Sequence, residues 1–226
     1  MLQQKQTIMK RLILAAVFLT TVSTFAQYGY RDGNRIGISA GVSQSSLFTN
    51  NFVTKPDIGY NGGLSIRGNY YNNWSMIYGM QFFLNNFKIE TSSSSLQKKE
   101  TQFSLTGIQV RLLGSYNVVK DHVSLDFGPV LQINGKMSVA SSDENYIIQG
   151  TLLKANQILD VTTINANFYV GFSAGGKVVR ANFFYQYGLN NILNNLNSQQ
   201  GLTALNGNNK FKGNIGTVSG QIIFNL

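Results

Sequence analysis

The sequence contains no cysteine and little charge. With 0 cysteines, the chain can form neither a disulfide framework nor a lipid anchor on cysteine. Charged residues make up only 12% of its 226 residues, which is about half of the share usual in soluble domains. Soluble β-sheet proteins generally carry lysine and glutamate on their outer face, so a chain this poor in charge is unusual for that class.

Long hydrophobic runs are also lacking. After residue 26 no apolar run reaches the roughly 18 to 20 residues that a membrane-spanning helix needs. The chain has 2 prolines and 23 glycines, a balance that suits strands and turns better than helices. Strands can still cross a membrane when they close into a barrel, because closure satisfies every backbone group between neighbouring strands.

The N-terminal segment has the pattern of a secretory signal peptide. Two basic residues precede a short apolar run, residues 12–19, and small residues follow up to Ala26. The run is shorter than a membrane span, so we expect cleavage after Ala26, with either Met1 or Met9 as the true start. The predicted domains are a signal peptide at 1–26, a short periplasmic segment at 27–34 and an outer-membrane barrel at 35–226.

The exported part keeps a positive charge. Three of the 18 basic residues belong to the signal, which leaves 15 against 9 acidic residues and a net charge of +6. The positive residues form no dense patch, so we interpret them as solvated loops and rims. Because the chain is also exported, we expect no nucleic-acid partner.

Residues 64–82, LSIRGNYYNNWSMIYGMQF, contain the clearest strand pattern. Apolar and polar residues alternate with a period of two on both sides of Asn72-Asn73, as in two strands with one apolar face each. Asparagine supplies the positive φ of a tight turn, so the pair predicts a hairpin. Six further segments alternate in the same way and bring the total to eight strands: 36–43, 102–116, 123–134, 165–173, 179–187 and 218–226.

The connections between these strands alternate in length. The long ones are predicted at about 44–58, 90–100, 136–162 and 190–210, and the short ones at 71–73, 117–121 and 175–177. Outer-membrane barrels have short periplasmic turns, longer external loops and an even number of strands, whereas a soluble sandwich need not gather its long loops at one end. The predicted fold is all-β, an eight-stranded antiparallel up-and-down transmembrane β-barrel integral to the outer membrane.

Aromatic residues near the strand ends predict girdles at the membrane surfaces. Tyr60 and Tyr70 lie ten residues apart with the same outward parity. At roughly 3.4 Å per residue and a tilt near 45°, they span about 24 Å of height, which is close to the apolar band of about 25 Å. We expect Trp74 and Tyr116 to join Tyr70 at the periplasmic rim. Strand propensity alone also explains tyrosine and tryptophan in strands, so that alternative stays open.

Polar residues of the inward parity predict a layer inside the barrel. Three arginines and one aspartate lie about three to six positions from the nearest short turn. Three guanidinium groups facing one carboxylate cannot all be paired, so the layer needs water, glutamine neighbours or a bound anion. We interpret it as a hydrated polar plug, with an anion-selective constriction as the alternative, because eight strands leave little open space. The layer comprises Arg67, Arg111, Asp126, Arg180, Gln81, Gln132 and Gln186.

Catalytic and metal sites are not indicated. The single histidine, His122, falls in a predicted periplasmic turn, whereas a barrel hydrolase would need it near the outer leaflet. GFSAGGK at 171–177 nearly spells a phosphate-binding loop, but Val178 follows where serine or threonine is required. A cation site would depend on three carboxylates that share one long loop, Asp143, Glu144 and Asp160. We predict no enzyme activity, no cofactor and no metal.

Four short motifs carry a resemblance to a known family. They are TFAQ at the end of the signal, RIGISAGVSQS in the first strand, LTGIQVRLLGSYNVVKDHVSLDFGPVLQINGK in the centre and IIFNL at the end. Residues 28–226 thereby resemble the Bacteroidota outer-membrane β-barrel family that includes the PorT-like proteins. The resemblance implies a small eight-stranded barrel, and one branch of the family is associated with assembly of a protein-secretion machine.

The C-terminus departs from the family pattern of a final aromatic residue. Leu226 is last, and Phe224 lies two residues earlier on the same face. The resemblance implies that the barrel-insertion machinery reads this end, with Phe224 as the main contact. Outer-membrane lipid is the other expected partner.

Two functions remain open, and a soluble secreted β protein is a third alternative. The first is a structural or binding component of the cell envelope, whose external loops contact an envelope protein; the resemblance adds an accessory role in protein secretion. The second is a narrow porin-like channel with a basic constriction. The loops at 136–162 and 190–210 should face outward.

We expect different structures for these two loops. YIIQGTLLKANQIL in the first is too apolar for a solvated loop, and we expect it to extend the strands as a hairpin around Gly150 rather than to form a partner surface. The second is rich in asparagine with leucine and isoleucine near helical spacing, which predicts a short helix or a mobile segment.

Overall fold

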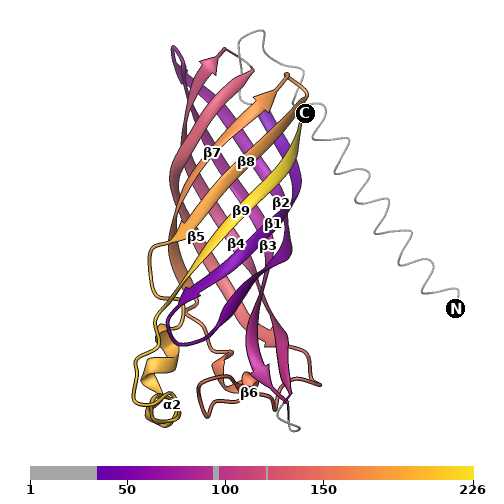
Figure 1. Cartoon of the computed structure of the whole chain (residues 1–226). Helices are drawn as coiled ribbons and strands as arrows, with labels where there is room; N and C mark the ends of the chain where they lie inside the picture. Colours follow the sequence, from indigo (N-terminus) through magenta and orange to yellow (C-terminus); the bar gives the residue numbers. More distant parts are fainter. Residues whose placement is uncertain (1–34, 94–96, 121) are drawn as a thin grey trace, which may run out of the picture.

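The computed structural model describes residues 35–93, 97–120 and 122–226, with the backbone alone for residues 69–71. Within these residues eight long strands form one closed antiparallel barrel (Figure 1). Each pairs with the next long strand along the chain, and the first also pairs with the last, which closes the ring. The strands are β1 (Arg35–Thr49), β2 (Thr54–Tyr71), β3 (Trp74–Ser92), β4 (Lys98–Val119), β5 (Val123–Val139), β7 (Ile164–Gly175), β8 (Val179–Gly188) and β9 (Gly213–Asn225). The predicted eight-stranded up-and-down barrel is confirmed.

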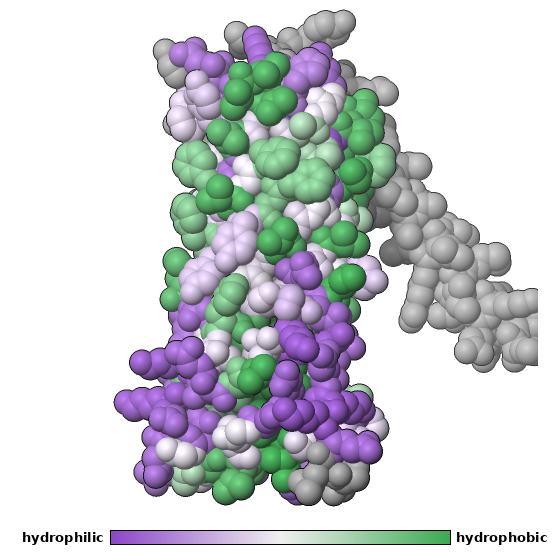
Figure 2. Space-filling view, in the orientation of Figure 1, coloured by the Kyte–Doolittle hydropathy of each residue, from purple (hydrophilic) through white to green (hydrophobic). Residues whose placement is uncertain are grey.

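The period of two in the sequence separates the two faces of the barrel wall. On β1, Ile38 and Val42 are exposed, whereas Ser39 and Ser43 are buried. The other strands repeat this pattern over the half of the barrel near the short turns. Exposed apolar residues of every long strand form an apolar belt around this half. On the face shown in Figure 2, apolar residues cover this half and hydrophilic residues gather towards the other end.

Short turns and the C-terminus lie at one end of the barrel, and the longer connections lie at the other (Figure 1). The β2–β3 turn contains Asn72 with a φ of 51°, which is the left-handed conformation that the hairpin prediction required. The predicted grouping of the loops is therefore present in the fold.

Two of the predicted long connections are mostly strand. The loops expected at 44–58 and 90–100 shrink to 50–53 and 93–97, because the flanking strands run on. The buried inward side chains of these extensions are Leu47 and two small polar residues, Ser45 and Thr91. Apolar inward residues just outside the extensions, among them Phe87 and Phe103, belong to the core beneath the remaining loops, so an extended wall buries more apolar area than a solvated loop would.

The predicted strand extension within 136–162 is wrong. Gly150 does adopt a φ of 81° in a tight turn, and one bridge joins Ile147 to Lys154. Instead of lengthening β5 and β7, the segment folds across the barrel end, where it forms the two-residue strand β6 (Ile147–Ile148) beside β3 and the short helix η1 (Ala155–Ile158). Its apolar residues do not alternate, so a flat hairpin would leave many of them in water.

The 189–212 connection contains two short helices, η2 (Asn194–Ser198) and α2 (Gln200–Leu205). The helical alternative for this loop is thus the one that the structure adopts. In the part of the chain that the structure describes, no helix is both long and apolar enough to span a membrane. The predicted signal peptide and the segment at 27–34 lie outside the described residues.

Candidate functional site

An apolar core fills the lumen at the end where the long loops lie. It combines inward residues of the strands with residues of the two loops, 140–163 and 189–212, that fold over the opening. The rings of Phe87 and Phe103 stack with centroids 6.2 Å apart, and Phe52 contacts Phe211 at 6.1 Å. Full burial of each such side chain contributes about 1.5–3 kcal/mol. We call this core and its two loops the cap; its innermost members are Leu47, Phe87, Ile89, Phe103, Leu105, Ile148, Leu153, Ile158, Leu193 and Phe211.

Asparagine side chains fix the backbone of the 189–212 loop. The Asn191 amide accepts hydrogen bonds from the backbone N–H of Leu193 at 3.1 Å and of Gly213 at 2.8 Å, and it donates to the carbonyl of Phe211 at 2.8 Å. Asn197 donates to the same carbonyl at 2.9 Å and accepts from the Phe211 N–H at 2.7 Å. The asparagine-rich sequence therefore satisfies backbone groups that no strand or helix satisfies.

A chain of amide side chains crosses the middle of the lumen. Gln81 donates to Gln109 at 2.6 Å, and Gln109 donates to Gln132 at 2.8 Å. Gln221 joins the start of this chain at 2.9 Å from Gln81, and Gln132 continues it to Asn134 at 2.6 Å. Gln81, Gln109 and Gln132 each both donate and accept, whereas Gln221 only donates, so the network holds neighbouring strands together across the interior.

This network corrects the predicted place of the glutamines. Gln81, Gln132 and Gln186 were expected as neighbours of the arginines, but they hydrogen-bond to one another and to further amides. Gln109 and Gln221 belong to the same network and were not predicted. Inward parity was the sequence signal available for Gln109 and Gln221, but it does not say which partners a long side chain reaches.

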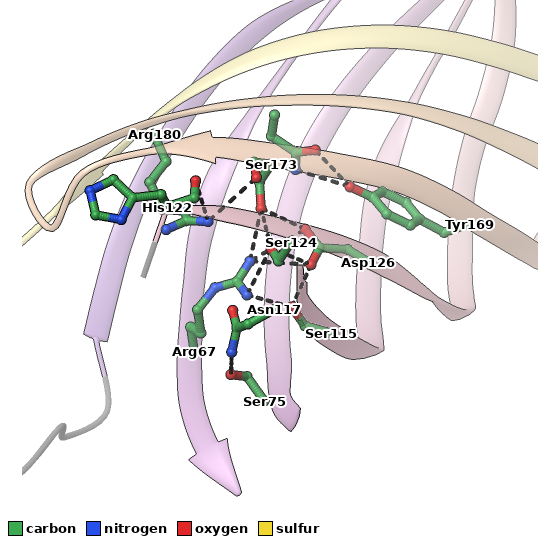
Figure 3. Close-up of polar contacts among 11 residues, drawn as sticks. Arg67, Ser75, Ser115, Asn117, His122, Ser124, Asp126, Tyr169, Ser173 and Arg180 are labelled. Carbon is green, nitrogen blue, oxygen red and sulfur yellow. Dashed lines mark hydrogen bonds and ion pairs between the residues drawn. The ribbon is translucent and has the colours of Figure 1, made fainter. Parts of the chain in front are cut away.

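A charged cluster occupies the lumen near the short turns (Figure 3). The carboxylate of Asp126 is 1% exposed and accepts hydrogen bonds from three serine hydroxyls at 2.6–3.0 Å. Arg67 approaches the same carboxylate with Nη2 at 3.3 Å from Oδ2. Charged groups with this many donors lose little on burial. The serines are Ser115, Ser124 and Ser173.

The other two predicted arginines lie close to this cluster. Arg180 donates to the carbonyls of Ser173 at 3.4 Å and His122 at 3.5 Å. Arg111 is also buried, and together with Arg67 and Arg180 it lines one small cavity. The structure thus places the three arginines of the predicted layer around one cavity, while Asp126 pairs with Arg67. On β4, Arg111 lies two residues from Gln109 of the amide chain.

A second small apolar cluster lies in the lumen between the amide chain and the Arg67–Asp126 pair. Tyr169 stacks on Phe184 with ring centroids 4.6 Å apart, and its hydroxyl exchanges hydrogen bonds with Asn182 at 2.9 and 3.1 Å. Its remaining members are Ile77, Leu113 and Val130. The lumen is therefore filled along its length, with apolar and polar layers in alternation.

Three of the four predicted girdle residues, Tyr60, Trp74 and Tyr116, lie on the outer wall. Trp74 and Tyr116 meet edge to face at 5.1 Å beside the β2–β3 turn, and Phe127, which was not among the predicted girdle residues, contacts Trp74 at 6.2 Å. Tyr60 is exposed on β2, while the side chain of Tyr70 lies outside the described residues. At the C-terminus, Phe224 and Leu226 are both exposed.

Ion pairs at the loop end use a carboxylate that was a candidate for metal binding. Asp143 accepts a hydrogen bond from Lys99 Nζ at 2.9 Å and another from the Ser142 hydroxyl at 2.7 Å. Burial raises the pKa of Asp143, but these hydrogen bonds outweigh burial and hold its pKa below the usual value of 3.8. The hydrogen bond to Asp143 in turn raises the pKa of Lys99.

No metal-ligand cluster or phosphate loop forms in the described ranges. Nowhere in 35–93, 97–120 and 122–226 do three histidine, cysteine, aspartate or glutamate residues gather closely enough to hold a metal ion. His122 is an exposed turn residue, with Nδ1 2.9 Å from the carbonyl oxygen of Lys120. The segment 171–177 ends β7 and turns into β8, as the hairpin interpretation required.

Comparisons with known proteins find similarity only at the level of architecture. No family model matches the chain, and no curated protein matches it in sequence. Among solved structures it is similar to Neisserial surface protein A, with 14% identity, a TM-score of 0.47 and coverage of 85% of this chain and 99% of that chain. The barrel assignment rests on the strand pairings of this chain, because similarity at this level carries no conclusion about ligands or partners.

Two further solved structures are also similar in architecture. One is Ail, the attachment invasion locus protein of Yersinia pestis, in complex with the heparin analogue sucrose octasulfate, at 14% identity and a TM-score of 0.48, covering 86% of this chain and 99% of that chain. The other is the outer membrane protein OprG from Pseudomonas aeruginosa, at 10% identity and a TM-score of 0.40, covering 87% and 95%.

Proposed function

We propose that this protein is an integral outer-membrane barrel with a sealed lumen, which acts as a structural or binding component of the cell envelope through its cap. The observation that carries the proposal is the filled interior. The amide chain and the Arg67–Asp126 cluster occupy one part of the lumen, and the apolar core of the cap closes the other. Water and ions need a continuous polar path, which an apolar core of close-packed side chains denies them.

The apolar belt supports a position in the membrane. Exposed aliphatic and aromatic residues surround the half of the barrel near the short turns, and Figure 2 shows one face of this belt. A belt of this kind faces lipid in outer-membrane barrels, which have their short turns in the periplasm and their long loops outside. The cap then lies on the cell exterior, and cleavage of the predicted signal peptide precedes insertion.

The cap is the part of the molecule suited to contact a partner. It is held by its own core and by the asparagine hydrogen bonds, so its surface is presented in one conformation. Leu152 at the tip of the 140–163 loop is 71% exposed, and Leu189 is 62% exposed. These two exposed leucines are the positions at which we propose contact with another envelope protein. The resemblance to the PorT-like barrels adds assembly of a secretion machine as the proposed context, and the same resemblance disfavours an enzyme.

Conductance separates the sealed barrel from the narrow channel with a basic constriction. The purified, refolded protein added to planar lipid bilayers should give no stable current steps at voltages where a porin in the same bilayer conducts. Discrete steps would contradict the sealed lumen. If steps occurred, a variant with Arg67, Arg111 and Arg180 all replaced by methionine would test the constriction, since its ion selectivity should then change.

Site-specific cross-linking tests the cap as the contact surface. A photoreactive residue in place of Leu152 should cross-link an envelope protein in growing cells, whereas one in place of Lys120, in the turn at the opposite end of the barrel, should not give the same product. Equal products at both positions would contradict a cap-specific partner. Protease added to intact cells should cut within 140–163, and cutting only after permeabilisation would reverse the proposed orientation.

A further inference from the structure

A small polar cavity lies inside the barrel near the short turns. It has a volume of about 20 Å³, and three of its lining residues are arginines, Arg67, Arg111 and Arg180. The polar residues Ser65, Asn182 and Asn225 and the apolar residues Ile77, Leu113 and Ile223 complete its lining. One water molecule needs about 10–15 Å³ of such space, so the cavity holds a single occupant of atomic size.

Arg111 is the lining residue whose charge is least well compensated. Its side chain projects from β4 into the lumen and is only 4% exposed, and its Nε is buried without a hydrogen-bond partner among the described residues. The guanidinium lies against the backbone of Gly79, where a Cβ on residue 79 would come within 3.3 Å of Nε. A bulkier residue at 79 would push the guanidinium away, so the glycine leaves room for the arginine to lie flat.

Asp126 forms no close ion pair with Arg111 among the described residues, and its charge attracts Arg111 only from beyond 4.0 Å. Among the described residues, Arg67 is the cation within 4.0 Å of this carboxylate, at 3.3 Å, and three serine hydroxyls take its remaining acceptor positions. Arg180 lines the same cavity and adds a further positive charge. Burial of a charged group without a close counter-charge is unfavourable, and a bound ion of opposite sign stabilises it.

We propose that this cavity binds a small inorganic anion of the size of chloride, with Arg111 as its principal donor. The cavity is close to the size of one water molecule, which favours a monatomic anion over phosphate, sulfate and organic anions. The anion sits between guanidinium groups of β2, β4 and β8, strands on different sides of the barrel, so it ties the wall together from within. The apolar core of the cap closes the other end, so the ion exchanges through the short-turn end.

Thermal unfolding in matched salts tests the site. The folded barrel runs as a compact band on unheated gels, and the temperature at which half of this band is lost should be higher in sodium chloride than in sodium gluconate at equal ionic strength. We expect a difference of about 2–4 °C for wild type, as for a ligand at several times its Kd. Equal temperatures in the two salts would overturn the proposal.

Two variants assign the effect to Arg111. Arg111→Met should abolish the difference between the unfolding temperatures in chloride and in gluconate. A change in the overall stability of the variant does not affect this test, because each variant is measured in both salts. Lys136→Met removes the same charge from an exposed position on β5 and should keep the difference. If the difference between chloride and gluconate persists in Arg111→Met, chloride acts by binding to the protein surface. That result would overturn the proposed site. If Arg111→Met does not fold, Arg111→Gln takes its place.

Crystals provide a readout that does not depend on stability. Bromide soaked into crystals of the wild-type barrel should give an anomalous peak within hydrogen-bonding distance of the Arg111 guanidinium, and the peak should be missing in crystals of the variant. A cavity without bromide in the wild type, with other bromide sites occupied, would contradict the proposal.

Discussion

The same strands fill the two ends of the lumen with different kinds of side chain. Strand β4 shows this along its own length, because its inward residues are Phe103 and Leu105 near the cap, but Arg111 and Ser115 near the short turns. Near the cap, loops cover the lumen and apolar side chains can pack against them. Near the short turns, the wall is surrounded by the apolar belt, and the interior holds polar groups that pair with each other.

Inward parity alone therefore does not determine whether a side chain of this barrel is polar or apolar. Outside the proposed membrane zone the strands behave as the wall of a soluble core, with apolar residues turned inward. Within the zone the pattern is inverted, with apolar residues turned towards lipid. Substitutions at the two ends should therefore destabilise the barrel by different mechanisms, namely an uncompensated charge at one end and a cavity at the other.

Removal of the carboxylate at the charged end should have the largest effect. In Asp126→Ala, the buried guanidinium of Arg67 loses its counter-charge, and we expect a loss of about 3–5 kcal/mol of stability, less whatever water entering the lumen restores. The temperature at which the folded band disappears on unheated gels should fall. Glu144→Ala, which removes the same charge from the 140–163 loop, should leave it nearly unchanged.

The double variant sharpens this prediction. Arg67→Met combined with Asp126→Ala removes both charges, so it should be more stable than Asp126→Ala alone. A single variant as heat-resistant as the parent would contradict the ion pair as a stabilising plug. So would a double variant whose loss equals the sum of the two single losses.

At the cap end, the largest effect should come from a buried loop residue. Leu153 is 0% exposed and belongs to the apolar core, so Leu153→Ala should cost about 2–5 kcal/mol through lost burial and a residual cavity. The loss should be local to the cap, with faster protease cleavage in 140–163 and a folded band that persists. The neighbouring Leu152 points to solvent, and Leu152→Ala should change neither property.

Asn191 tests whether the second loop is held by its side-chain hydrogen bonds. Asn191→Ala removes three hydrogen bonds to backbone groups, and we expect a loss of about 1–3 kcal/mol from the cap, since the N–H groups of Leu193 and Gly213 lose their acceptor. Hydrogen exchange at these two amides should accelerate, while exchange at the strand amides stays as in wild type. Asn50→Ala, at an exposed position between β1 and β2, is the matched control. Unchanged exchange in Asn191→Ala would show that packing alone holds the loop.

The outer wall was predictable because its signal is local. A period of two needs only near neighbours in sequence, and Ile38, Val42, Ser39 and Ser43 each face the side that their parity assigns. Asn72 in the β2–β3 turn is a second local signal, since a tight hairpin turn requires a positive φ. Strand number, strand direction and the grouping of the loops all follow from signals of this kind.

The cap and the pairing inside the lumen were less predictable because they depend on tertiary contacts. Residues 147–158 carry apolar side chains without a period, and only the presence of an opening to cover makes folding inward better than forming a hairpin. Likewise, parity predicts that Arg111 faces the lumen, but not that Arg67 takes the Asp126 carboxylate and leaves Arg111 beside a cavity. A long side chain can reach several partners, and the sequence does not show which of these partners it binds.

The smallest effect should come from acid titration of the ion pair on the cap surface. The pKa of Asp143 is lower in the folded protein than its usual value of 3.8, so the folded state favours the ionised carboxylate. Its contribution is fully present above the pKa of the unfolded chain and is lost as the pH falls through the lowered folded pKa. The pKa of Lys99 is raised above 10.5, so the ammonium stays charged throughout this range. Below about pH 4, protonation of Asp143 therefore breaks its contact with Lys99.

Limited proteolysis with an acid-active protease measures this effect. Cleavage of the wild-type cap near 140–146 should accelerate as the pH falls below about 4, whereas Asp143→Asn should be cut at a rate that lacks this extra dependence. Leu153→Ala should be cut faster at every pH, because its defect is a cavity in the core rather than a titrating group. A wild-type cap whose cleavage rate follows that of Asp143→Asn at every pH would show that packing alone holds this loop. The surface pair would then play no part in closing the barrel.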